Sequence, residues 1–520
     1  MFPVMLTILG AVPLVGALVV AFLKGATARW VGLGFAVVTL ALAVYAAVTG
    51  SDGSLDGAIQ WIPMIGAHFA LALDPLALVM VLLTVVLVPV VLIATWDDPD
   101  HHAHPRGEAD PEPGRRSKLV PQQRFGGVAF VSLALALEGL AVLVFMASDV
   151  FLFYLLFEAT LIPMYFLIGG FGGAKRASAA VKFLIFSLAG GLLMLAAVIG
   201  LYAASAGQGS PTYLISELAQ TGIDGNVGRW LFVGFFIAFA VKAPMVGVHA
   251  WLPAAAEEST PGGATLLTGI LDKLGTFGMI KICLGIFPEA SQWATPLIII
   301  WAVISILYGA LAAIGQRDLM RFVAFTSISH FGFIVLGIFA LTTQSLTGAI
   351  FYMVSHGLST AALFLAVGYL TKRRGSRLVA DFGGVQKVAP IAAGVLLVAG
   401  LSTLALPGMS SFVSEYMVLA GTFGRYPWAA AISAIAVVLA AVYVLRTYQR
   451  TMTGPVTEQV SDTFTSDLSG REKLAIGPLI ALILVLGFFP KPMLDVITPV
   501  SQEIQQHAGV TDPEPKGANR

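Results

Sequence analysis

The most constraining feature of this sequence is a series of long, continuous apolar runs that extends over nearly the whole chain. Hydrophobic residues make up 57% of the 520 residues and charged residues only 11%, a composition that does not fit a soluble globular protein. A helix needs about 20 apolar residues to cross the hydrocarbon core, where only helices or closed barrels satisfy their backbone. Because the runs do not alternate with polar residues, they predict an all-α, polytopic membrane protein.

About fourteen membrane-spanning helices are expected. They are placed near residues 3–23, 30–49, 71–95, 127–146, 150–170, 179–205, 229–253, 262–287, 293–314, 322–341, 345–370, 390–422, 428–448 and 473–490. The corresponding divisions of the chain are N-terminal helices over 1–95, a disordered cytoplasmic loop over 96–126, five helices over 127–290, five more over 291–450, a last helix with its flanks over 451–504, and a disordered tail over 505–520.

The distribution of basic residues predicts how these helices are oriented. Lysines and arginines follow the odd-numbered spans, whereas aspartates and glutamates follow the even-numbered spans, with Arg425 as a lone basic residue. Because cytoplasmic loops are enriched in basic residues, both termini are expected on the non-cytoplasmic side of the cell (inner) membrane. The connection after the seventh span is an exception, since it carries Glu257 and Glu258. The first apolar run lacks a preceding basic residue and is expected to be a retained span.

Composition also limits the chemistry of the chain. The 29 basic and 29 acidic residues balance, so net charge does not suggest nucleic acid as a partner. The single cysteine, Cys283, excludes a disulfide framework, a four-cysteine zinc site and an iron-sulfur cluster held by this chain alone. Segment 97–118 contains His101, His102 and His104, but a loop so rich in proline, glycine and charge is typically solvated and not a metal site.

Ionisable residues lie near the middle of seven predicted spans, where an isolated charge costs about 2.5 to 3.5 kcal/mol. They are Glu138, Glu158, Lys242, Lys273, His330, His356 and Glu415. Acids and bases nearly balance, so we expect these groups to form a row at one depth that faces the protein interior. Lys182 is expected to extend its ammonium group to the cytoplasmic surface. His249 shares a helix face with Lys242 at roughly 10 Å, which suits either a helix-end or a proton-carrying role.

The pairing of Glu158 with Lys242 is central to a proton-path interpretation. Burial disfavours the charged form of each group, whereas their mutual attraction keeps both charged. The pair is therefore expected to act as a latch that releases a proton when the partners separate. The competing interpretation is purely structural, since a buried pair can simply hold helices together.

The remaining groups suit onward proton transfer. Lys273 is placed to receive the proton, His330 and His356 to pass it on, and Glu415 to be the terminal group. Water and nearby hydroxyl groups are expected to bridge the histidines, namely those of Thr326, Ser327 and Ser329. A histidine on an apolar helix is equally often a hydrogen-bonded core residue, so a structural role for the two histidines stays open.

Helix-breaking residues interrupt two of the predicted spans. The seventh contains Pro244 and Pro253, and the twelfth contains Pro407 followed by Gly408. Proline removes a backbone donor and clashes with the preceding turn, so each helix is expected to break and to free carbonyl groups for protein or internal water. Interrupted helices in corresponding positions of two halves also suggest an inverted repeat, here spans 4 to 8 against spans 9 to 13.

Five segments resemble a known family. They are FLFYLLFEATLIPMYFLIG at 151–169, AVKAPMVGVHAWLP at 240–253, GILDKLGTFG at 269–278, SISHFG at 327–332 and VSHGLS at 354–359. Their order and spacing resemble the antiporter-like subunits of proton-pumping NADH:quinone oxidoreductase, respiratory complex I, over nearly the whole chain. A glutamate as last relay residue, Glu415, and the short segment after the last span resemble the subunit M type (mitochondrial subunit 4).

This resemblance implies a fold with fourteen helices, two inverted five-helix repeats, and broken helices 7 and 12. It implies that Glu158 and Lys242 are the family's acid–lysine pair. It also assigns the central lysine to Lys273, the helix 10 and 11 positions to His330 and His356, and the exit acid to Glu415.

The resemblance further implies that the chain is a translocase subunit of NADH:quinone oxidoreductase that passes protons, driven by quinone reduction elsewhere in the assembly. No cofactor is expected in this chain, whereas FMN, iron-sulfur clusters and quinone are expected in partner subunits. Other membrane-arm subunits, with antiporter-like subunits L and N as neighbours, and the lipid bilayer are the expected partners.

Two features depart from the family pattern. Asp272 stands beside the central lysine at a position expected to be apolar, where a carboxylate could hold Lys273 charged, although it lies about 100° around the helix from it. The connection LPAAAEESTPGG after the seventh span lacks the aspartate and histidine of the commoner form. Asp272 is therefore kept as an additional candidate relay residue.

Two other functions are compatible with parts of the pattern. A subunit of a multi-subunit Na⁺/H⁺ antiporter would share the glutamate and lysine motifs, but Glu415 and the chain length favour the redox-driven complex. A scaffold that joins neighbouring subunits would not account for so many buried ionisable groups.

Overall fold

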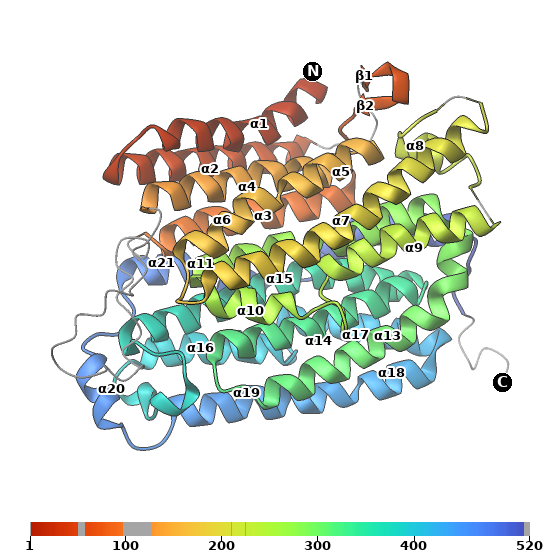
Figure 1. Ribbon diagram of the computed structural model, residues 1–520. Coiled ribbons are helices and arrows are strands. Elements are labelled where there is room, and N and C mark those ends of the chain that lie inside the picture. The colour runs from red at the N-terminus through yellow and green to blue at the C-terminus, as the bar shows by residue number, and fades with distance from the viewer. Residues whose placement is uncertain (1, 50–57, 97–125, 210, 224, 514–520) are drawn as a thin grey trace.

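The computed structural model describes residues 2–49, 58–96, 126–209, 211–223 and 225–513. These residues form a bundle in which most helices run side by side along one direction (Figure 1). The described residues contain one sheet, a two-stranded antiparallel hairpin. The predicted all-α membrane fold is therefore confirmed.

The first part of the chain contributes seven long helices and the hairpin. The helices are α1 (Phe2–Ala21), α2 (Gly25–Thr49), α3 (Pro75–Ala94), α4 (Gly127–Met146), α5 (Val150–Ala159), α6 (Leu161–Phe171) and α7 (Arg176–Ala206). The hairpin between α2 and α3 consists of β1 (Ile59–Ile62), the short helix η1 (Pro63–Ile65) and β2 (Ala67–Phe69).

The middle of the chain is divided into shorter helices. They are α8 (Ile215–Leu218), α9 (Gly225–Lys242), α10 (Trp251–Glu258), α11 (Pro261–Leu266), the π-helical turn η3 (Leu267–Leu271), α12 (Lys273–Gly278) and the π-helical turn η4 (Met279–Leu284). Three long helices follow, α13 (Pro288–Ile314), α14 (Leu319–Phe339) and α15 (Thr343–Arg374).

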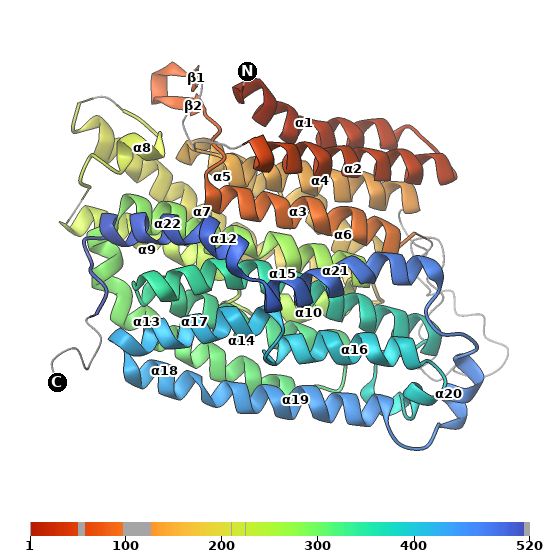
Figure 2. The same ribbon diagram turned by 180° about the vertical axis from the view of Figure 1, so that it is seen from behind.

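The last part of the chain wraps the outside of these helices. It contains η5 (Val379–Asp381), η6 (Val385–Lys387), α16 (Pro390–Thr403), α17 (Ser410–Arg425), α18 (Pro427–Ser433), α19 (Ile435–Met452), α20 (Glu458–Thr463), α21 (Gly470–Phe488) and α22 (Lys491–His507). Viewed from behind, α21 and α22 lie across α15 (Figure 2).

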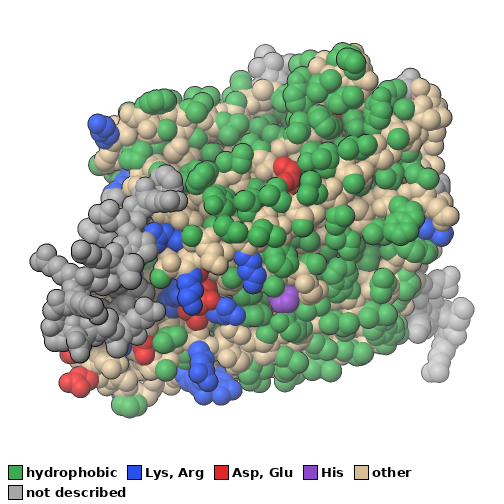
Figure 3. Space-filling view, viewed as in Figure 1, with side chains coloured by type: hydrophobic (Ala, Val, Ile, Leu, Met, Phe, Trp, Pro, Cys, Tyr) green, Lys and Arg blue, Asp and Glu red, His purple; other side chains and the backbone are tan. Residues whose placement is uncertain are grey.

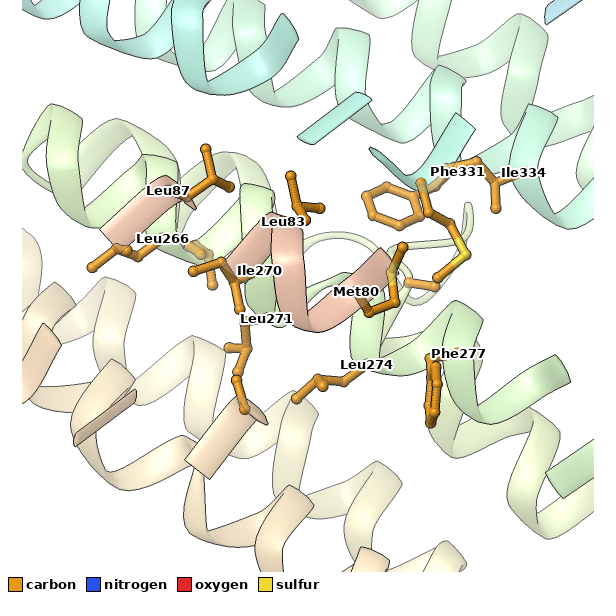
Figure 4. Packing of buried hydrophobic residues seen from close by; sticks show 14 of the residues in the cluster. Met80, Leu83, Leu87, Leu266, Ile270, Leu271, Leu274, Phe277, Phe331 and Ile334 are labelled. Atoms are coloured by element: carbon orange, nitrogen blue, oxygen red, sulfur yellow. The ribbon is translucent and has the colours of Figure 1, made fainter. Parts of the chain in front are cut away.

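The centre of the bundle is formed by α14 and α15. Every side chain from Ser345 to Leu370 of α15 is buried, so this helix has no lipid-facing stripe within that range. Apolar side chains of α3, including Leu83 and Leu87, lie beside Ile270 of the π-helical turn η3, and Met80 and Leu271 belong to the same buried cluster (Figure 4). This packing fixes the segment that carries the central lysine.

Local sequence explains where several helices begin. Asp74 caps α3 by accepting a hydrogen bond from the Ala77 N–H at 2.8 Å, and Pro75 follows it as the first helical residue, which suits the fixed φ of proline. Asp149 caps α5 by accepting from the Phe151 and Leu152 N–H groups. Both caps lie at helix ends, where backbone donors lack helical partners.

The number of spans agrees with the sequence prediction only in part. Ten helices in the described ranges are long and apolar enough to cross a membrane, and the α21–α22 pair, bent by 70°, would make eleven. Spans predicted over 262–287 and 390–422 are each divided in the structure, and the apolar part of α1 is short. The count of fourteen and the inverted repeat therefore stay predictions.

The predicted breaks in the seventh and twelfth spans are confirmed. The seventh span is α9 and α10, separated by residues 243–250, and the twelfth is α16 and α17, separated by residues 404–409. Glycine stands at positive φ in both gaps, with Gly247 at 92° and Gly408 at 94°, a conformation that costs glycine little. Proline and glycine together therefore explain both breaks.

The C-terminal segment corrects the prediction of a disordered tail from Gln505. Helix α22 continues to His507, and the chain is described to residue 513. The segment has tertiary partners: the Gln505 amide oxygen accepts from the Thr343 hydroxyl at 2.8 Å, and His507 Nε2 lies 2.9 Å from the Gly285 carbonyl oxygen. The loop predicted over 96–126, with its histidine cluster, lies outside the described residues for 97–125.

The molecular surface has a membrane-like division of side chains. Hydrophobic side chains cover most of the face shown in Figure 3, and basic side chains gather near one end of it. Helix α1 begins and α22 ends at the opposite end of the bundle (Figures 1 and 2).

Candidate functional site

The central lysine lies where the helix changes its hydrogen-bond pattern. In the π-helical turn η3 the Asp272 N–H bonds to the Leu267 carbonyl at 3.1 Å, five residues back, not to Thr268. The Thr268 carbonyl accepts a hydrogen bond from the Lys273 ammonium group instead. Such π-turns are frequent at functional sites because they re-aim the side chains that follow.

Lys273 and the two predicted histidines are brought into one buried chain. The Lys273 Nζ lies 2.7 Å from His356 Nδ1, and both side chains are essentially inaccessible to solvent. The His356 and His330 rings follow at a centroid distance of 5.4 Å. Because an ammonium group only donates, His356 Nδ1 accepts in this contact and its Nε2 carries the hydrogen.

The chain continues to Glu415 through a residue that the sequence did not predict. The Tyr352 ring lies 5.7 Å from the His330 ring, and its hydroxyl donates to Glu415 Oε2 at 2.8 Å. Tyr352 precedes His356 by four residues, so both lie on one face of α15. That i, i+4 spacing was the available signal, although a tyrosine at mid-depth carries no charge that would single it out.

Lys242 is the last residue of α9, at the break in the helix. Its Nζ lies 4.8 Å from the Phe157 ring centroid and 5.7 Å from that of Phe183. Within the described part of the chain it has no hydrogen-bond partner, and it interacts electrostatically with Glu158 and Asp272. The aromatic faces partly compensate a buried cation that lacks direct contact with a carboxylate.

Glu158 lies on α5 and is only partly buried. Its Oε1 has no hydrogen-bond partner among the described residues. A Cβ atom on Gly191 of α7 would come within 2.2 Å of this oxygen, so glycine provides the room for the carboxylate. Glu158 and Lys242 attract each other electrostatically, as the sequence predicts, but they form no hydrogen-bonded ion pair because the lysine is directed at the aromatic rings.

Two further carboxylates are buried without hydrogen-bond partners in the described structure. Glu138 of α4 and Asp272, between η3 and α12, are both fully inaccessible to solvent, and all four of their side-chain oxygens are unpartnered. Asp272 interacts electrostatically with both Lys273 and Lys242. Within the described residues Glu138 forms no hydrogen bond with the side chains that lead from Lys273 to Glu415, and we treat it separately from that chain.

His249 and Lys182 form a separate pair nearer the surface. His249 Nδ1 accepts a hydrogen bond from the Gly247 N–H at 3.1 Å, and its ring packs 5.0 Å from that of Tyr308. Lys182 is partly exposed and interacts electrostatically with His249. His249 therefore shapes the end of the broken helix, which agrees with one of its two predicted roles.

The three hydroxyl groups expected to bridge the histidines form no direct hydrogen bond to them, so a path through these groups and water stays a prediction. All three donate to backbone carbonyls: Thr326 to Val323 at 2.8 Å, Ser327 to Val323 at 3.1 Å and Ser329 to Ile306 at 2.8 Å. Hydroxyl groups on helices commonly bond to the preceding turn in this way.

A different set of buried hydroxyl groups lies beside the row. The Ser355 and Ser414 oxygens are 2.9 Å apart, and Ser359 lies 2.6 Å from Ser402 and 3.1 Å from Ser411. These contacts join α15 to both halves of the broken twelfth span. Serines separated by so many residues could not be paired from the sequence.

The acidic connection after the seventh span is neutralised by neighbouring segments. Glu257 accepts from Arg321 at 2.8 Å, and the Glu258 carboxylate accepts from the Lys175 N–H at 2.9 Å. Arg377 donates to the Glu257 carbonyl and lies 3.1 Å from Asp318. Burial raises the pKa of Asp318, and the Arg377 guanidinium opposes that shift. This pairing explains the exception to the charge rule.

Metal binding finds no support in the described ranges. Between residues 2 and 513, gaps excepted, no group of three or more histidine, cysteine, aspartate or glutamate side chains is arranged to hold a metal ion. His101, His102 and His104 fall within the gap 97–125.

Comparison with known proteins agrees with the fold. A family model described as NADH:quinone oxidoreductase/Mrp antiporter, TM, matches residues 147–441. NADH-quinone oxidoreductase subunit M of Mycobacterium tuberculosis is 48% identical over 537 residues, which cover 99% of this chain and 96% of the relative. The subunit M of Escherichia coli (strain K12) is 34% identical over 494 residues, 92% of each chain.

Solved structures show the same fold. A chain in the structure of respiratory complex I from Thermus thermophilus with bound NADH has a TM-score of 0.84 and 29% identity, covering 97% of this chain and 100% of that one. A chain of the Mrp complex from Dietzia sp. shares the fold, with a TM-score of 0.81, 20% identity and coverage of 97% and 98%. The chain therefore belongs to the subunit M family of NADH-quinone oxidoreductase, the antiporter-like membrane subunits of respiratory complex I.

Proposed function

We propose that this chain is a proton-translocating membrane-arm subunit in which quinone reduction elsewhere in the complex drives protons along a buried relay. The observation that carries the proposal is the continuous chain of contacts from Lys273 through His356, His330 and Tyr352 to Glu415. Each of these side chains is at most 6% exposed. A buried row of titratable groups in a membrane protein is expensive and is expected to serve a function.

The hydrogen-bond geometry supports proton transfer between Lys273 and His356 and does not by itself set the direction of that transfer. Lys273 donates to His356 Nδ1, so its proton can pass to the imidazole while the Nε2 hydrogen leaves on the other side. His330 Nε2 lies 3.1 Å from the Thr403 carbonyl, which only accepts, so its Nδ1 is the accepting nitrogen. The Tyr352 hydroxyl then links the imidazoles to Glu415, which we assign as the terminal group.

Lys242 and Glu158 form the first stage of the same proposed relay. Lys242 holds its charge among aromatic rings and two attracting carboxylates, so movement of Glu158 changes the stability of that charge. Moving one proton against 100 mV requires about 2.3 kcal/mol, which is within reach of such a charge switch. Glu138, His249 and Lys182 are assigned to the periphery of the relay.

The assembly and orientation follow the same proposal. FMN, iron-sulfur clusters and quinone are assigned to partner subunits, and the antiporter-like subunits L and N to neighbouring positions in the membrane arm. We assign both chain ends to the non-cytoplasmic side because α1 begins and α22 ends at one end of the bundle, whereas basic side chains gather near the other (Figures 1 and 3). Residues 127–290 and 291–450 are assigned to the two antiporter-like repeats.

Substitution of the first-stage pair tests this proposal. In the intact complex, Lys242→Ala or Glu158→Ala is expected to lower proton pumping and coupled NADH:quinone turnover about tenfold, equivalent to about 1.4 kcal/mol of barrier. NADH oxidation by an artificial acceptor should persist, because it bypasses the membrane arm. Lys491→Ala, on an exposed lysine of α22, serves as the control. If the variants assemble and keep a normal proton-to-electron ratio, the relay proposal is contradicted.

A further inference from the structure

Asp272 is a costly buried side chain beside the relay that the chain from Lys273 to Glu415 does not use. It lies between the π-helical turn η3 and α12, is fully inaccessible to solvent, and leaves both carboxylate oxygens without a hydrogen-bond partner in the described residues. Buried carboxylates normally accept several hydrogen bonds, and each exception calls for a functional or solvent-mediated explanation. Neither stability nor helix capping explains this residue.

The π-helical turn separates the directions of Asp272 and Lys273. Lys273 extends to the Thr268 carbonyl and to His356 on α15. Asp272 interacts electrostatically with Lys273 and also with Lys242, which ends α9. The Asp272 carboxylate is therefore the group that interacts electrostatically with both lysines.

Close backbone packing brings α12 to the broken end of α9. A Cβ atom on Gly275 would lie 2.6 Å from the Phe239 carbonyl and 2.8 Å from the Ala243 nitrogen, so glycine is required for this approach. Phe239 and Ala243 flank Lys242 in sequence. The first turn of α12 thus lies directly against the helix end that carries the first lysine of the relay.

No other titratable group within the described structure interacts with both lysines. On α5, Glu158 interacts with Lys242, and on α15, His356 contacts Lys273. Glu138 on α4, a helix that also packs against α12, shows no electrostatic interaction with either lysine. Asp272 is therefore the acceptor through which the two lysines are connected.

We propose that Asp272 is the proton carrier between Lys242 and Lys273. An N–H bond of the Lys242 ammonium breaks as an O–H bond forms on the Asp272 carboxylate. That O–H bond then breaks as an N–H bond forms on the neutral amine of Lys273. One proton moves, no electron is transferred, and one ordered water can bridge each step because water satisfies unpartnered buried polar groups.

This inference rests on the proposed relay, but different experimental results would contradict the two proposals. If Lys242→Ala in the intact complex leaves pumping normal, the relay itself is wrong. If Lys242→Ala lowers pumping about tenfold whereas Asp272→Asn leaves it normal, only the role of Asp272 is wrong.

The test uses Asp272→Asn in the whole complex, in membrane vesicles energised with NADH. Asparagine keeps the shape but cannot carry a proton, so pumping and coupled turnover are expected to fall about tenfold, to the level of Lys242→Ala, at every pH from about 6 to 8. NADH oxidation by an artificial acceptor reports the amount of assembled complex. Normal pumping by the assembled variant would overturn the proposal.

The pH profile separates proton transfer from a static countercharge. If Asp272 only holds the lysines protonated, acidification replaces its effect, and the activity of Asp272→Asn recovers toward pH 6. The titratable groups that face Asp272 or its two lysine partners are Lys242, Lys273, Glu158, His356 and His330. Such recovery contradicts the carrier, whereas a pH-independent loss supports it.

A second variant keeps the proposal testable if Asp272→Asn does not assemble. Asp272→Glu retains the acid but adds one methylene group, so proton transfer is expected to slow while the proton-to-electron ratio stays unchanged. The solvent deuterium effect on pumping should then exceed that of the unmodified complex, since transfer has become rate-limiting. A lowered pumping rate with an unchanged deuterium effect contradicts the carrier.

Discussion

At the scale of single residues, charge made the site predictable and neutral residues completed it. A lysine, histidine or glutamate in an apolar run attracts attention because burial is costly, and this identified Lys273, His356 and Glu415. Tyr352 and Gly191 carry no such signal. Their importance comes from tertiary contacts, a hydrogen bond to Glu415 and the space beneath Glu158, which a single sequence does not contain.

The Tyr352 hydroxyl is expected to be needed for transfer to Glu415. In Tyr352→Phe, the Glu415 carboxylate loses its donor, and removing a hydrogen bond to a charged group costs about 1.5 to 3 kcal/mol. Proton pumping in the intact complex should fall roughly tenfold. Tyr416→Phe is the matched control, because Tyr416 follows Glu415 but is 59% exposed. Equal effects of both substitutions would argue against a role for the Tyr352 hydroxyl.

Adjacent glycines on α7 provide a matched test of the Glu158 position. In Gly191→Ala the new methyl group would meet Glu158 Oε1 at 2.2 Å, so the carboxylate must move. In Gly190→Ala the nearest atoms, in Ala238 and Val241, lie at 3.4 Å, an ordinary contact. We expect coupled turnover to drop in the first variant and to stay near normal in the second. A normal rate for Gly191→Ala would show that the carboxylate position is unimportant.

At the scale of elements, the sequence predicted where two helices break, but not which side chains bond to the backbone groups that the breaks leave free. Pro244 predicted the interruption of the seventh span, and the freed groups were expected to need protein or water. The structure supplies indole and hydroxyl groups: Trp251 donates to the Val241 carbonyl at 2.9 Å and Trp301 to that of Val246 at 2.7 Å, and the Ser305 hydroxyl accepts from the Val246 N–H at 2.7 Å. The π-helical turns η3 and η4, in the predicted eighth span, were not predictable, because they depend on packing around the Lys273 segment.

The Trp301 indole is expected to stabilise the break between α9 and α10. Trp301→Phe removes this donor from the partly buried Val246 carbonyl, and losing a typical hydrogen bond costs about 0.5 to 1.5 kcal/mol. The temperature at which coupled turnover is irreversibly lost should fall. Trp428→Phe is the control, since Trp428 is 45% exposed. Equal thermal inactivation of the two variants would contradict this role.

At the scale of the whole molecule, contacts between distant segments determine which polar segments are ordered and which charges are paired, and composition does not show these contacts. Long apolar runs predicted the helical bundle, but the polar sequence after Gln505 suggested disorder, whereas tertiary hydrogen bonds hold it on the bundle. In the same way, Glu257 and Glu258 are an exception to the charge rule, and Arg321 and Arg377 from distant segments lie beside them. Arg377 joins the end of α10 to the start of α14, and thus segments assigned to different repeats.

Arg377 is therefore expected to hold the two halves together in a pH-dependent way. Its guanidinium lies 3.1 Å from Asp318 and 3.9 Å from Glu258, and both partners are largely buried. In Arg377→Ala these carboxylates lose their cation, at a cost between the 0 to 1 kcal/mol of surface pairs and the roughly 3 to 5 kcal/mol of buried ones. The exposed Arg450→Ala is the control.

The sign of the pH effect follows from Asp318. Burial raises the pKa of its carboxyl group and Arg377 opposes that shift, so removing the arginine raises the pKa further. Arg377 stabilises only the ionised form, and its contribution is present above the pKa of Asp318 and lost as the pH falls through it. The difference in thermal inactivation temperature between the unmodified complex and Arg377→Ala should thus be largest near neutral pH and narrow on acidification. A difference independent of pH would assign the role of Arg377 to its hydrogen bond with the Glu257 carbonyl.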